Sequence, residues 1–379
     1  MAGHPVCVGV VGCGTIAQFH FQAVKELGED TAALVALCDL REERLEQAHQ
    51  LWPAARLARE VRELMAPGDL DLVIVGTMPH THASIAIAAL EGGAHVLCEK
   101  PFAMNAAEGQ AILDAAAGAG RQFQLCTNLR YLPTSQYLRE LVNSGSVGIP
   151  LLCKIWSYHL NPPWWAPHYH RSTSGGGVLA STLIHALDQA IWVSGCPNPL
   201  SVQAVARRVF PEKRGPLATG EVRARYDVED LLSGFVRFDN GMVATLEGNW
   251  CYERGDSIGF ELVTTQATLS SVPFGVLVDK GGKVVDQTPE LAGAEFARRA
   301  FWHLTDQVEP GKPLEVADTE LIAAWTRSIC AQDADAIQRL IQGRPWELQN
   351  RRQLLNLQRL IDGCYESAQL GRPVELAPA

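Results

Sequence analysis

The first third of the chain alternates short apolar runs with longer amphipathic segments. Each run is apolar throughout, which is typical of strands in a parallel sheet buried on both faces. The segments between the runs have helical spacing. This alternation predicts a doubly wound parallel α/β domain that ends near Thr127. The predicted strands are a run from Val8 into Gly12, then 34–39, 70–76, 95–98 and 122–126, and the predicted helices are 18–27, 41–50, 60–65, 83–91 and 106–117.

The rest of the chain has a different pattern, with many strands and few intervening helices. Asp239-Asn240-Gly241 is a hairpin turn signal between two of the strands. From Glu295 the chain is again helical and returns to Leu376. We therefore predict a large, mainly antiparallel open sheet with helices on one face, as an α/β domain. Its predicted strands are 151–158, 202–209, 233–238, 241–250, 259–264 and 267–271.

Composition and length agree with two globular domains, which we place at 1–127 and 128–379. The 379 residues are 47% apolar and 20% charged, and the formal net charge is −10. Nucleic-acid binding needs a basic face, so this charge argues against it. No apolar run reaches the roughly 18 residues of a membrane span. The N-terminus enters the first strand directly, without room for a signal peptide, and we expect a cytoplasmic protein.

The ten cysteines do not predict disulfides or a zinc site. No CxxC pair occurs, and several cysteines lie in or beside predicted buried strands, where a free thiol behaves as a small apolar group. The pairs His80-x-His82 and His168-x-His170 have no cysteine or carboxylate cluster near them at ligand spacing. We expect reduced cysteines and no bound metal.

A glycine loop follows the first strand. In Gly12-x-Gly14-x-x-Ala17, Gly12 allows a tight turn, Gly14 lets the backbone approach a pyrophosphate, and Ala17 permits close packing of helix on sheet. The pyrophosphate would bind the free N–H groups of the helix that begins there. Asp39 ends the second strand about 20 residues later, where a carboxylate meets ribose hydroxyls. These residues predict a dinucleotide site.

Glu99-Lys100-Pro101 directly follows the strand that ends at Cys98. Ligands of open parallel sheets bind at the carboxyl ends of the strands, so Lys100 should point toward the reactive end of the cofactor. An ammonium group there can stabilise a developing alkoxide. The alternative is an ordinary surface lysine after a strand.

A second candidate lies after the triplet Gly175-Gly176-Gly177. If a helix begins near Val178, then Ser181, His185 and Asp188 form one polar stripe on an apolar helix. A histidine with hydrogen-bonding neighbours suits proton transfer near neutral pH. The alternative is a core histidine whose hydrogen bonds are satisfied.

Further polar and aromatic residues gather at the domain junction and before the glycine triplet. They offer donors and ring faces of the kind that bind polyhydroxylated ligands, and each is equally compatible with plain packing. They are Asn128, Arg130, Tyr131, Trp164, Trp165, Tyr169 and Arg171.

Together these motifs resemble the Gfo/Idh/MocA oxidoreductases, the glucose–fructose oxidoreductase and inositol dehydrogenase family. The resemblance covers nearly the whole chain. It implies a Rossmann domain, a second domain whose open sheet face forms homodimers or homotetramers, and hydride transfer between a nicotinamide and a sugar or polyol carbon. It places Lys100 and His185 at the reacting oxygen. The matching motifs are the glycine loop, 79–82, 93–101, 128–131, the glycine triplet with His185 and Asp188, and 365–374.

The resemblance also assigns the remaining site residues. Asp188 would support His185. Substrate contacts are expected from Lys100, Arg130, Tyr131, Trp165, Arg171, Ser181 and His185. Cofactor contacts are expected from Gly12, Gly14, Thr15, Ile16, Ala17, Asp39, Arg41, Thr77, Pro79, His82, Glu99, Lys100, Pro101 and Asn128.

The sequence departs from the family pattern at two positions. Ser181 stands where the family usually has aspartate, and Leu183 where it has glycine. Serine removes the negative charge that would favour protonated His185, and Leu183 adds bulk near the pocket. The substrate cannot be transferred from the family.

NAD is the expected cofactor, with NADP possible. Asp39 would accept hydrogen bonds from both ribose hydroxyls and repel a 2′-phosphate, while Arg41 would soften that preference. The leading hypothesis is a dehydrogenase or ketoreductase acting on a sugar, cyclic polyol or sugar derivative. Two alternatives remain: a redox-neutral enzyme that uses retained NAD for transient oxidation during elimination or epimerisation, and a non-catalytic dinucleotide-binding regulator.

Overall fold

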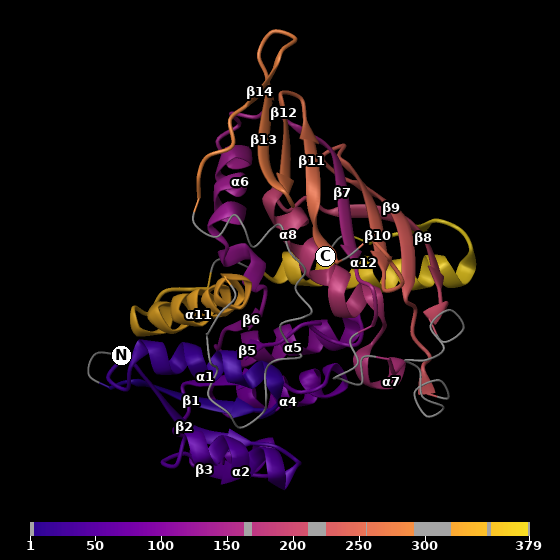
Figure 1. Cartoon of the computed structure of the whole chain (residues 1–379). Coiled ribbons are helices and arrows are strands. Elements are labelled where there is room, and N and C mark those ends of the chain that lie inside the picture. Colours follow the sequence, from indigo (N-terminus) through magenta and orange to yellow (C-terminus); the bar gives the residue numbers. More distant parts are fainter. Residues whose placement is uncertain are drawn as a thin grey trace. The chain divides into compact units, whose positions relative to one another are not determined.

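The computed structural model describes residues 4–162, 169–210, 225–254, 256–291, 320–346 and 350–377 (Figure 1). The chain forms two compact units. The first consists of Met1–Asn128 with Leu304–Leu354, and the second of Leu129–His303 with Leu355–Ala379. Across the described helices, no segment combines the length and hydrophobicity needed to cross a membrane.

The first unit contains a six-stranded parallel sheet in the order β3-β2-β1-β4-β5-β6. The chain starts in the middle of the sheet, runs outward to β3, and then crosses to the other side of β1 through β4. This is the predicted doubly wound sheet. Its strands are β1 (Val6–Val11), β2 (Ala32–Cys38), β3 (Arg56–Ala58), β4 (Leu72–Val75), β5 (His95–Cys98) and β6 (Phe123–Leu125).

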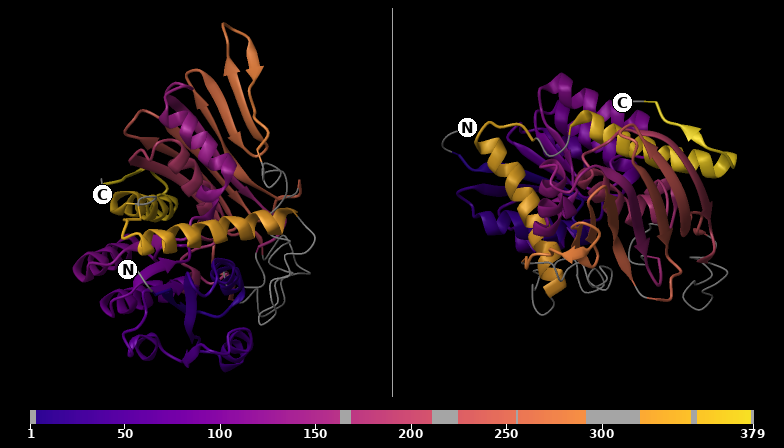
Figure 2. Two further views of the ribbon diagram at one scale, coloured as in Figure 1. Left: turned by 90° about the vertical axis from the view of Figure 1, so that its left-hand side faces the viewer. Right: turned by 90° about the horizontal axis from the view of Figure 1, so that it is seen from above.

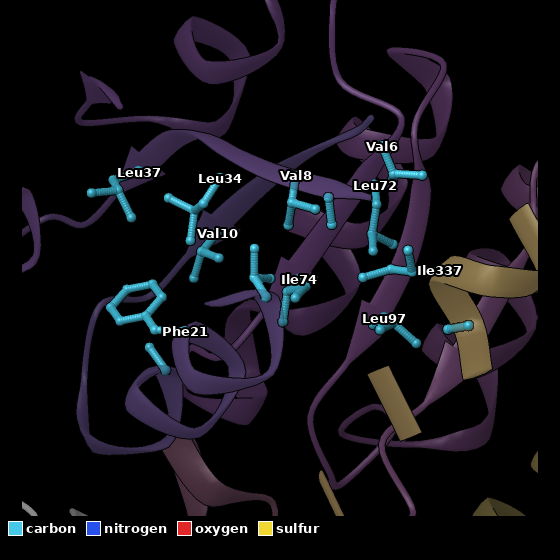
Figure 3. Close-up of a cluster of buried hydrophobic side chains, with 14 of the residues drawn as sticks. Val6, Val8, Val10, Phe21, Leu34, Leu37, Leu72, Ile74, Leu97 and Ile337 are labelled. Carbon is cyan, nitrogen blue, oxygen red and sulfur yellow. The ribbon is translucent and has the colours of Figure 1, made fainter. Parts of the chain in front are cut away.

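Helices alternate with these strands along the chain, and buried aliphatic side chains fill the core between them. Figure 3 shows Val8, Val10 and Ile74 of the sheet lying together with Phe21 and Ile337 of two helices. The helices are α1 (Thr15–Leu27), α2 (Glu42–Leu51), α3 (Val61–Met65), η1 (Pro79–Thr81), α4 (His82–Glu91), α5 (Ala106–Ala119) and α11 (Glu320–Ile341).

Helix α11 belongs to the first unit, although the predicted division placed everything after residue 127 in the second domain. It packs against α1, and Ala336, Ile337 and Leu340 are buried in the core of the parallel sheet. Helical spacing of apolar residues shows that a helix is buried, but it does not show which sheet covers it.

The second unit contains a nine-stranded sheet in the order β14-β13-β12-β11-β7-β10-β9-β8-β15. All neighbours are antiparallel except β7 and β10, which run parallel. The predicted turn at Gly241 joins β9 and β10, with Gly241 at φ +85°. The strands are β7 (Pro150–Tyr158), β8 (Pro199–Arg207), β9 (Leu231–Phe238), β10 (Val243–Asn249), β11 (Ser257–Thr264), β12 (Ala267–Ser271), β13 (Phe274–Asp279), β14 (Val284–Asp286) and β15 (Val374–Glu375).

Helices cover one face of this sheet (Figure 2). Helix α8 packs on β7 and β11, and α6 packs on β12. Burial alternates along β9 and β10, so the opposite face is the exposed one. The helical elements are η2 (Asn128–Tyr131), α6 (Pro133–Asn143), α7 (Arg171–Ser174), the π-helix η3 (Leu179–Leu183), α8 (Ile184–Val193) and α12 (Arg351–Leu370).

Candidate functional site

The glycine loop joins β1 to α1 with the geometry a dinucleotide needs. Gly12 has φ +93°, and a Cβ there would lie 2.7 Å from the carbonyl carbon and oxygen of Gly76. Any side chain would therefore strain the turn and collide with the loop after β4. Gly14 is the N-cap of α1, which has no acidic residue in its first turn. The free N–H groups of Thr15, Ile16 and Ala17 leave this helix end suited to an anion.

Asp39 lies directly beside this loop at the end of β2. Its Oδ2 accepts the backbone N–H of Cys13 at 2.8 Å, and its Oδ1 accepts the N–H of Arg41 at 2.8 Å. Two backbone donors thus fix the orientation of the carboxylate, and each oxygen keeps a lone pair for a hydroxyl. The Arg41 side chain is exposed. This arrangement fits the ribose end of a dinucleotide.

His82 connects the loops that follow β4 and β5. The histidine is fully buried, its Nδ1 lies 2.8 Å from the carbonyl oxygen of Pro101, and its Nε2 lies 3.1 Å from that of Thr77. Burial lowers the pKa of His82. His82 thus links the two loops through its contacts with Thr77 and Pro101. Pro79, three residues earlier, is also buried.

Lys100 follows β5 at the carboxyl edge of the parallel sheet and is partly buried. Its backbone N–H donates to Oε2 of Glu99 at 3.2 Å. Burial lowers the pKa of Lys100, and the nearby Glu99 carboxylate opposes that shift. A lysine in this state can exchange a proton more readily than an exposed one.

Two predicted cofactor residues turn into the interior of the first unit. Glu99 forms an ion pair with His20 of α1 at 3.4 Å, and Asn128 Nδ2 donates to Ser328 Oγ at 2.8 Å. The role of His20 was missed at the sequence level. The available signal was a histidine on the apolar side of α1, in line with Ala17, Ala23 and Val24, which are buried in the structure.

In the second unit, the segment carrying Ser181 and His185 is not one regular α-helix. Residues Leu179–Leu183 form a π-helix, and the α-helix begins only at Ile184. The predicted stripe assumed α-helical spacing from Val178 onward, so its spacing is wrong between Ser181 and His185. Both side chains are buried. π-Helical turns occur frequently at functional sites.

Asp188 holds Arg130 rather than leaving it for a ligand. Arg130 donates from Nε at 2.8 Å and from Nη2 at 2.5 Å to the two carboxylate oxygens, and both side chains are 5% exposed. The guanidinium also lies over the ring of Trp192, 5.7 Å from its centroid. Arg130 and the buried Tyr131 belong to the second unit, where the ion pair with Asp188 fixes Arg130.

Packing requires two glycines of the triplet, Gly176 and Gly177. A Cβ at Gly176 would lie 1.8 Å from the hydroxyl of Tyr365, and one at Gly177 would lie 1.8 Å from the carbonyl oxygen of Glu229. The Glu229 carboxylate accepts the N–H groups of Gly177 and Leu179 and the Tyr365 hydroxyl. These contacts anchor the start of η3. No sequence motif had indicated this role of Glu229.

Arg171 lies next to this anchor, with its guanidinium 4.6 Å from the ring centroid of Tyr365. Its backbone N–H donates to Asp227 at 2.6 Å. Trp165, predicted to bind substrate, lies outside the described residues, as does Trp164.

The two proposed catalytic residues lie in different units: Lys100 belongs to the first unit and His185 to the second.

Two family models match this chain in succession. The NAD-binding Rossmann fold of the oxidoreductase family matches residues 6–127, and the GFO/IDH/MocA C-terminal domain matches residues 135–270. The chain belongs to the Gfo/Idh/MocA oxidoreductase family. The predicted family, α/β fold and NAD-binding Rossmann domain are thereby confirmed.

Named members of the Gfo/Idh/MocA family resemble the chain over different lengths. D-glucoside 3-dehydrogenase of Escherichia coli K12 is 28% identical over 325 residues, 84% of this chain and 92% of that protein. Levoglucosan dehydrogenase of Pseudarthrobacter phenanthrenivorans is 30% identical over 225 residues, 55% of this chain and 57% of that protein. A levoglucosan dehydrogenase structure in complex with NADH and L-sorbose covers all of both chains with a TM-score of 0.81 at 21% identity.

Proposed function

We propose that this oxidoreductase transfers a hydride between NAD and a secondary alcohol of a sugar, cyclic polyol or sugar derivative. The observation that carries the proposal is Lys100, a partly buried lysine of lowered pKa at the carboxyl edge of the parallel sheet. Relatives named D-glucoside 3-dehydrogenase and Myo-inositol 2-dehydrogenase support this substrate class.

The proposed chemistry divides between two side chains. Bound NAD supplies the hydride acceptor. Lys100 donates a hydrogen bond to the reacting oxygen and stabilises the alkoxide that develops on it. His185 takes the proton of the hydroxyl in oxidation and returns it in reduction. Ser181, Tyr131, Trp165 and Arg171 are proposed to bind the other hydroxyls, whereas Arg130 is assigned to holding Asp188.

NAD rather than NADP is the proposed physiological cofactor. The fixed Asp39 carboxylate beside the glycine loop suits the two ribose hydroxyls and would repel a 2′-phosphate. Pro79, His82 and Pro101 would shape the loops around the nicotinamide end. Arg41 is the cation that would soften the preference.

A homodimer or homotetramer formed through the exposed sheet face is the proposed assembly. Val205 on β8, Phe235 on β9 and Leu277 on β13 are 56%, 44% and 40% exposed. Strand register from β8 through β10, β7 and β11 to β13 places all three on the same exposed face, and apolar groups gathered on one face support an association surface there. All ten cysteines are free thiols, which fits the proposed cytoplasmic location. The net charge argues against a nucleic-acid partner.

NADH formation by purified protein against inositols, aldoses, glucosides, amino sugars and sugar acids tests the proposal. We expect formation with a subset, and the accepted hydroxyls would locate the reacting carbon. Ser181, in place of the family aspartate, favours one second candidate, in which retained NAD supports elimination or epimerisation. Product formation without accumulated NADH would favour that candidate. Tight NADH binding without any reaction would favour a regulator.

A further inference from the structure

A buried charged cluster in the first unit includes Glu99, the residue directly before Lys100. His20 of α1 stands between two carboxylates: its Nδ1 is 2.7 Å from Oδ2 of Asp333 on α11, and its Nε2 is 3.4 Å from Oε1 of Glu99. His20 and Asp333 are fully buried, and Glu99 is nearly so. Gln332 Nε2 donates to the other oxygen of Asp333 at 3.2 Å.

The charges of this cluster depend on one another. A neutral imidazole has one N–H, so it can donate to only one of the two carboxylates, and the second would face a lone pair. An imidazolium turns an N–H toward each carboxylate, as a hydrogen bond to Asp333 and an ion pair with Glu99. A buried carboxylate without a compensating charge or donor is strongly destabilising. The arrangement of Glu99 and Asp333 around His20 therefore favours the doubly protonated ring.

We propose that His20, oriented by Asp333, is a positioning residue that holds Glu99 and thereby the loop that carries Lys100. Glu99 provides the link because Oε1 faces His20 while Oε2 accepts the backbone N–H of Lys100. The inference rests on the proposed function, in which Lys100 contacts the reacting oxygen. It adds a residue from α11, more than 200 positions away in the sequence, to the support of that loop.

A metal ion is the competing explanation for the same side chains. The ligand atoms of His20, Glu99 and Cys126 lie within 4.8 Å of one another, and a carboxylate such as Asp333 commonly orients a metal-bound histidine. A protonated His20 ring, however, turns one N–H toward each of the two carboxylates without any ion. We therefore assign the cluster a proton, and metal analysis is one arm of the test.

The test compares Asp333→Asn with Asp335→Asn. Asp335 lies on the same helix and pairs with Arg339 one turn away at 2.9 Å, in a partly exposed position. In Asp333→Asn the His20 ring faces one carboxylate instead of two, so at about pH 8 it becomes neutral, and its contact with Glu99 weakens from an ion pair to a contact with a neutral ring. We expect kcat on the accepted polyol to fall about tenfold, with NADH affinity within about twofold of the wild-type value.

The pH dependence separates positioning from a merely structural role. In Asp333→Asn the activity should recover as the pH falls to about 6, because His20 regains its second proton there. Asp335→Asn should match the wild type at both pH values. Equal activity of Asp333→Asn and wild type, or an equal loss at both pH values, would overturn the inference while leaving the role of Lys100 intact.

Two further measurements do not depend on activity. Nitrogen-15 NMR of the His20 ring should show both nitrogens protonated at about pH 8. A neutral ring would overturn the inference. Elemental analysis showing a stoichiometric metal that His20→Gln loses would also overturn it, in favour of the metal site.

Discussion

At the scale of single residues, Asp39 is positioned to decide which dinucleotide binds. Its two backbone hydrogen bonds fix the carboxylate beside the glycine loop. Asp39→Ser would remove the charge that repels a 2′-phosphate and leave Arg41 as a nearby cation. We expect NADH affinity to fall and NADPH affinity to rise, each about tenfold or about 1.4 kcal/mol.

Fluorescence titration with both reduced dinucleotides measures this change in preference. Leu40→Ser, at the exposed neighbouring position, is the control. An unchanged NADH/NADPH ratio in Asp39→Ser would show that Asp39 does not select the cofactor.

His20 should make stability depend on alkaline pH. Burial alone would lower its pKa, but Asp333 and Glu99 outweigh burial and raise it to about 10. Because the folded pKa lies above the unfolded value near 6.5, the stabilisation is complete below about pH 6.5 and is lost as the pH rises toward 10. The free energy of unfolding should fall by up to about 1.4 kcal/mol per pH unit in this window.

Denaturant unfolding of wild type and His20→Gln between about pH 6.5 and 10 tests this dependence. We expect the difference between the two proteins to shrink as the pH rises, because only the wild type has the proton to lose. A constant difference across the window would mean that His20 is not protonated in the folded protein.

For the strands and helices, the hydrophobic pattern of the sequence predicts an element well when the element's own residues carry that pattern. β5 and β12 have the predicted bounds, and α1 begins three residues before its predicted start. The short strands β13 and β14 and helix α6 were not predicted. A strand as exposed as β14 has little apolar pattern of its own, and its pairing with β13 defines it.

The site residues also divide into those that the local sequence predicts and those that depend on distant partners. The glycine loop, Asp39 and Lys100 each closely follow a strand of their own, β1, β2 and β5, so each could be predicted from the residues next to it in the sequence. Glu229 and Asp333 act on residues far away in the sequence, and no local spacing reveals such a partner. The contacts of Glu229 with Gly177 and Leu179, and of Asp333 with His20, are formed only in the folded structure.

The entry into η3 depends on Gly177. A Cβ there would overlap the carbonyl of Glu229, whereas a Cβ at Gly118 of α5 meets nothing within 4 Å. We expect Gly177→Ala to lower the free energy of unfolding by about 1–3 kcal/mol through overpacking. Gly118→Ala should be neutral or slightly stabilising, because alanine favours a helix interior. Chemical denaturation of both variants checks this, and equal stabilities would contradict the packing account of the triplet.

The buried pair between η2 and α8 should also be costly to break. Asp188→Asn leaves the Arg130 guanidinium buried without its compensating charge, and we expect a loss of about 3 kcal/mol. The exposed pair of Arg56 and Asp69 offers the control variant Asp69→Asn, for which we expect less than about 1 kcal/mol. Similar unfolding free energies for the two variants would show that the buried pair is not a major support.

At the scale of the whole molecule, the exposed sheet face determines the proposed assembly. Phe235→Asp places a charge on that face, and we expect it to shift the protein to monomers without unfolding it. Leu370→Asp, an exposed apolar position at the end of α12, is the control. Light scattering coupled to size exclusion measures both masses, and an unchanged oligomer in Phe235→Asp would place the interface elsewhere.

We propose that this NAD-binding oxidoreductase oxidises a sugar or polyol alcohol with Lys100 at the reacting oxygen. The most direct test is NADH formation by wild type and Lys100→Met with NAD and the polyol panel. We predict that wild type forms NADH with a subset of the panel. Lys100→Met should lose about 10²–10³-fold in kcat, because it lacks the donor to the developing alkoxide, while NADH affinity is nearly unchanged. Full activity of Lys100→Met would show that Lys100 does not act at the reacting oxygen.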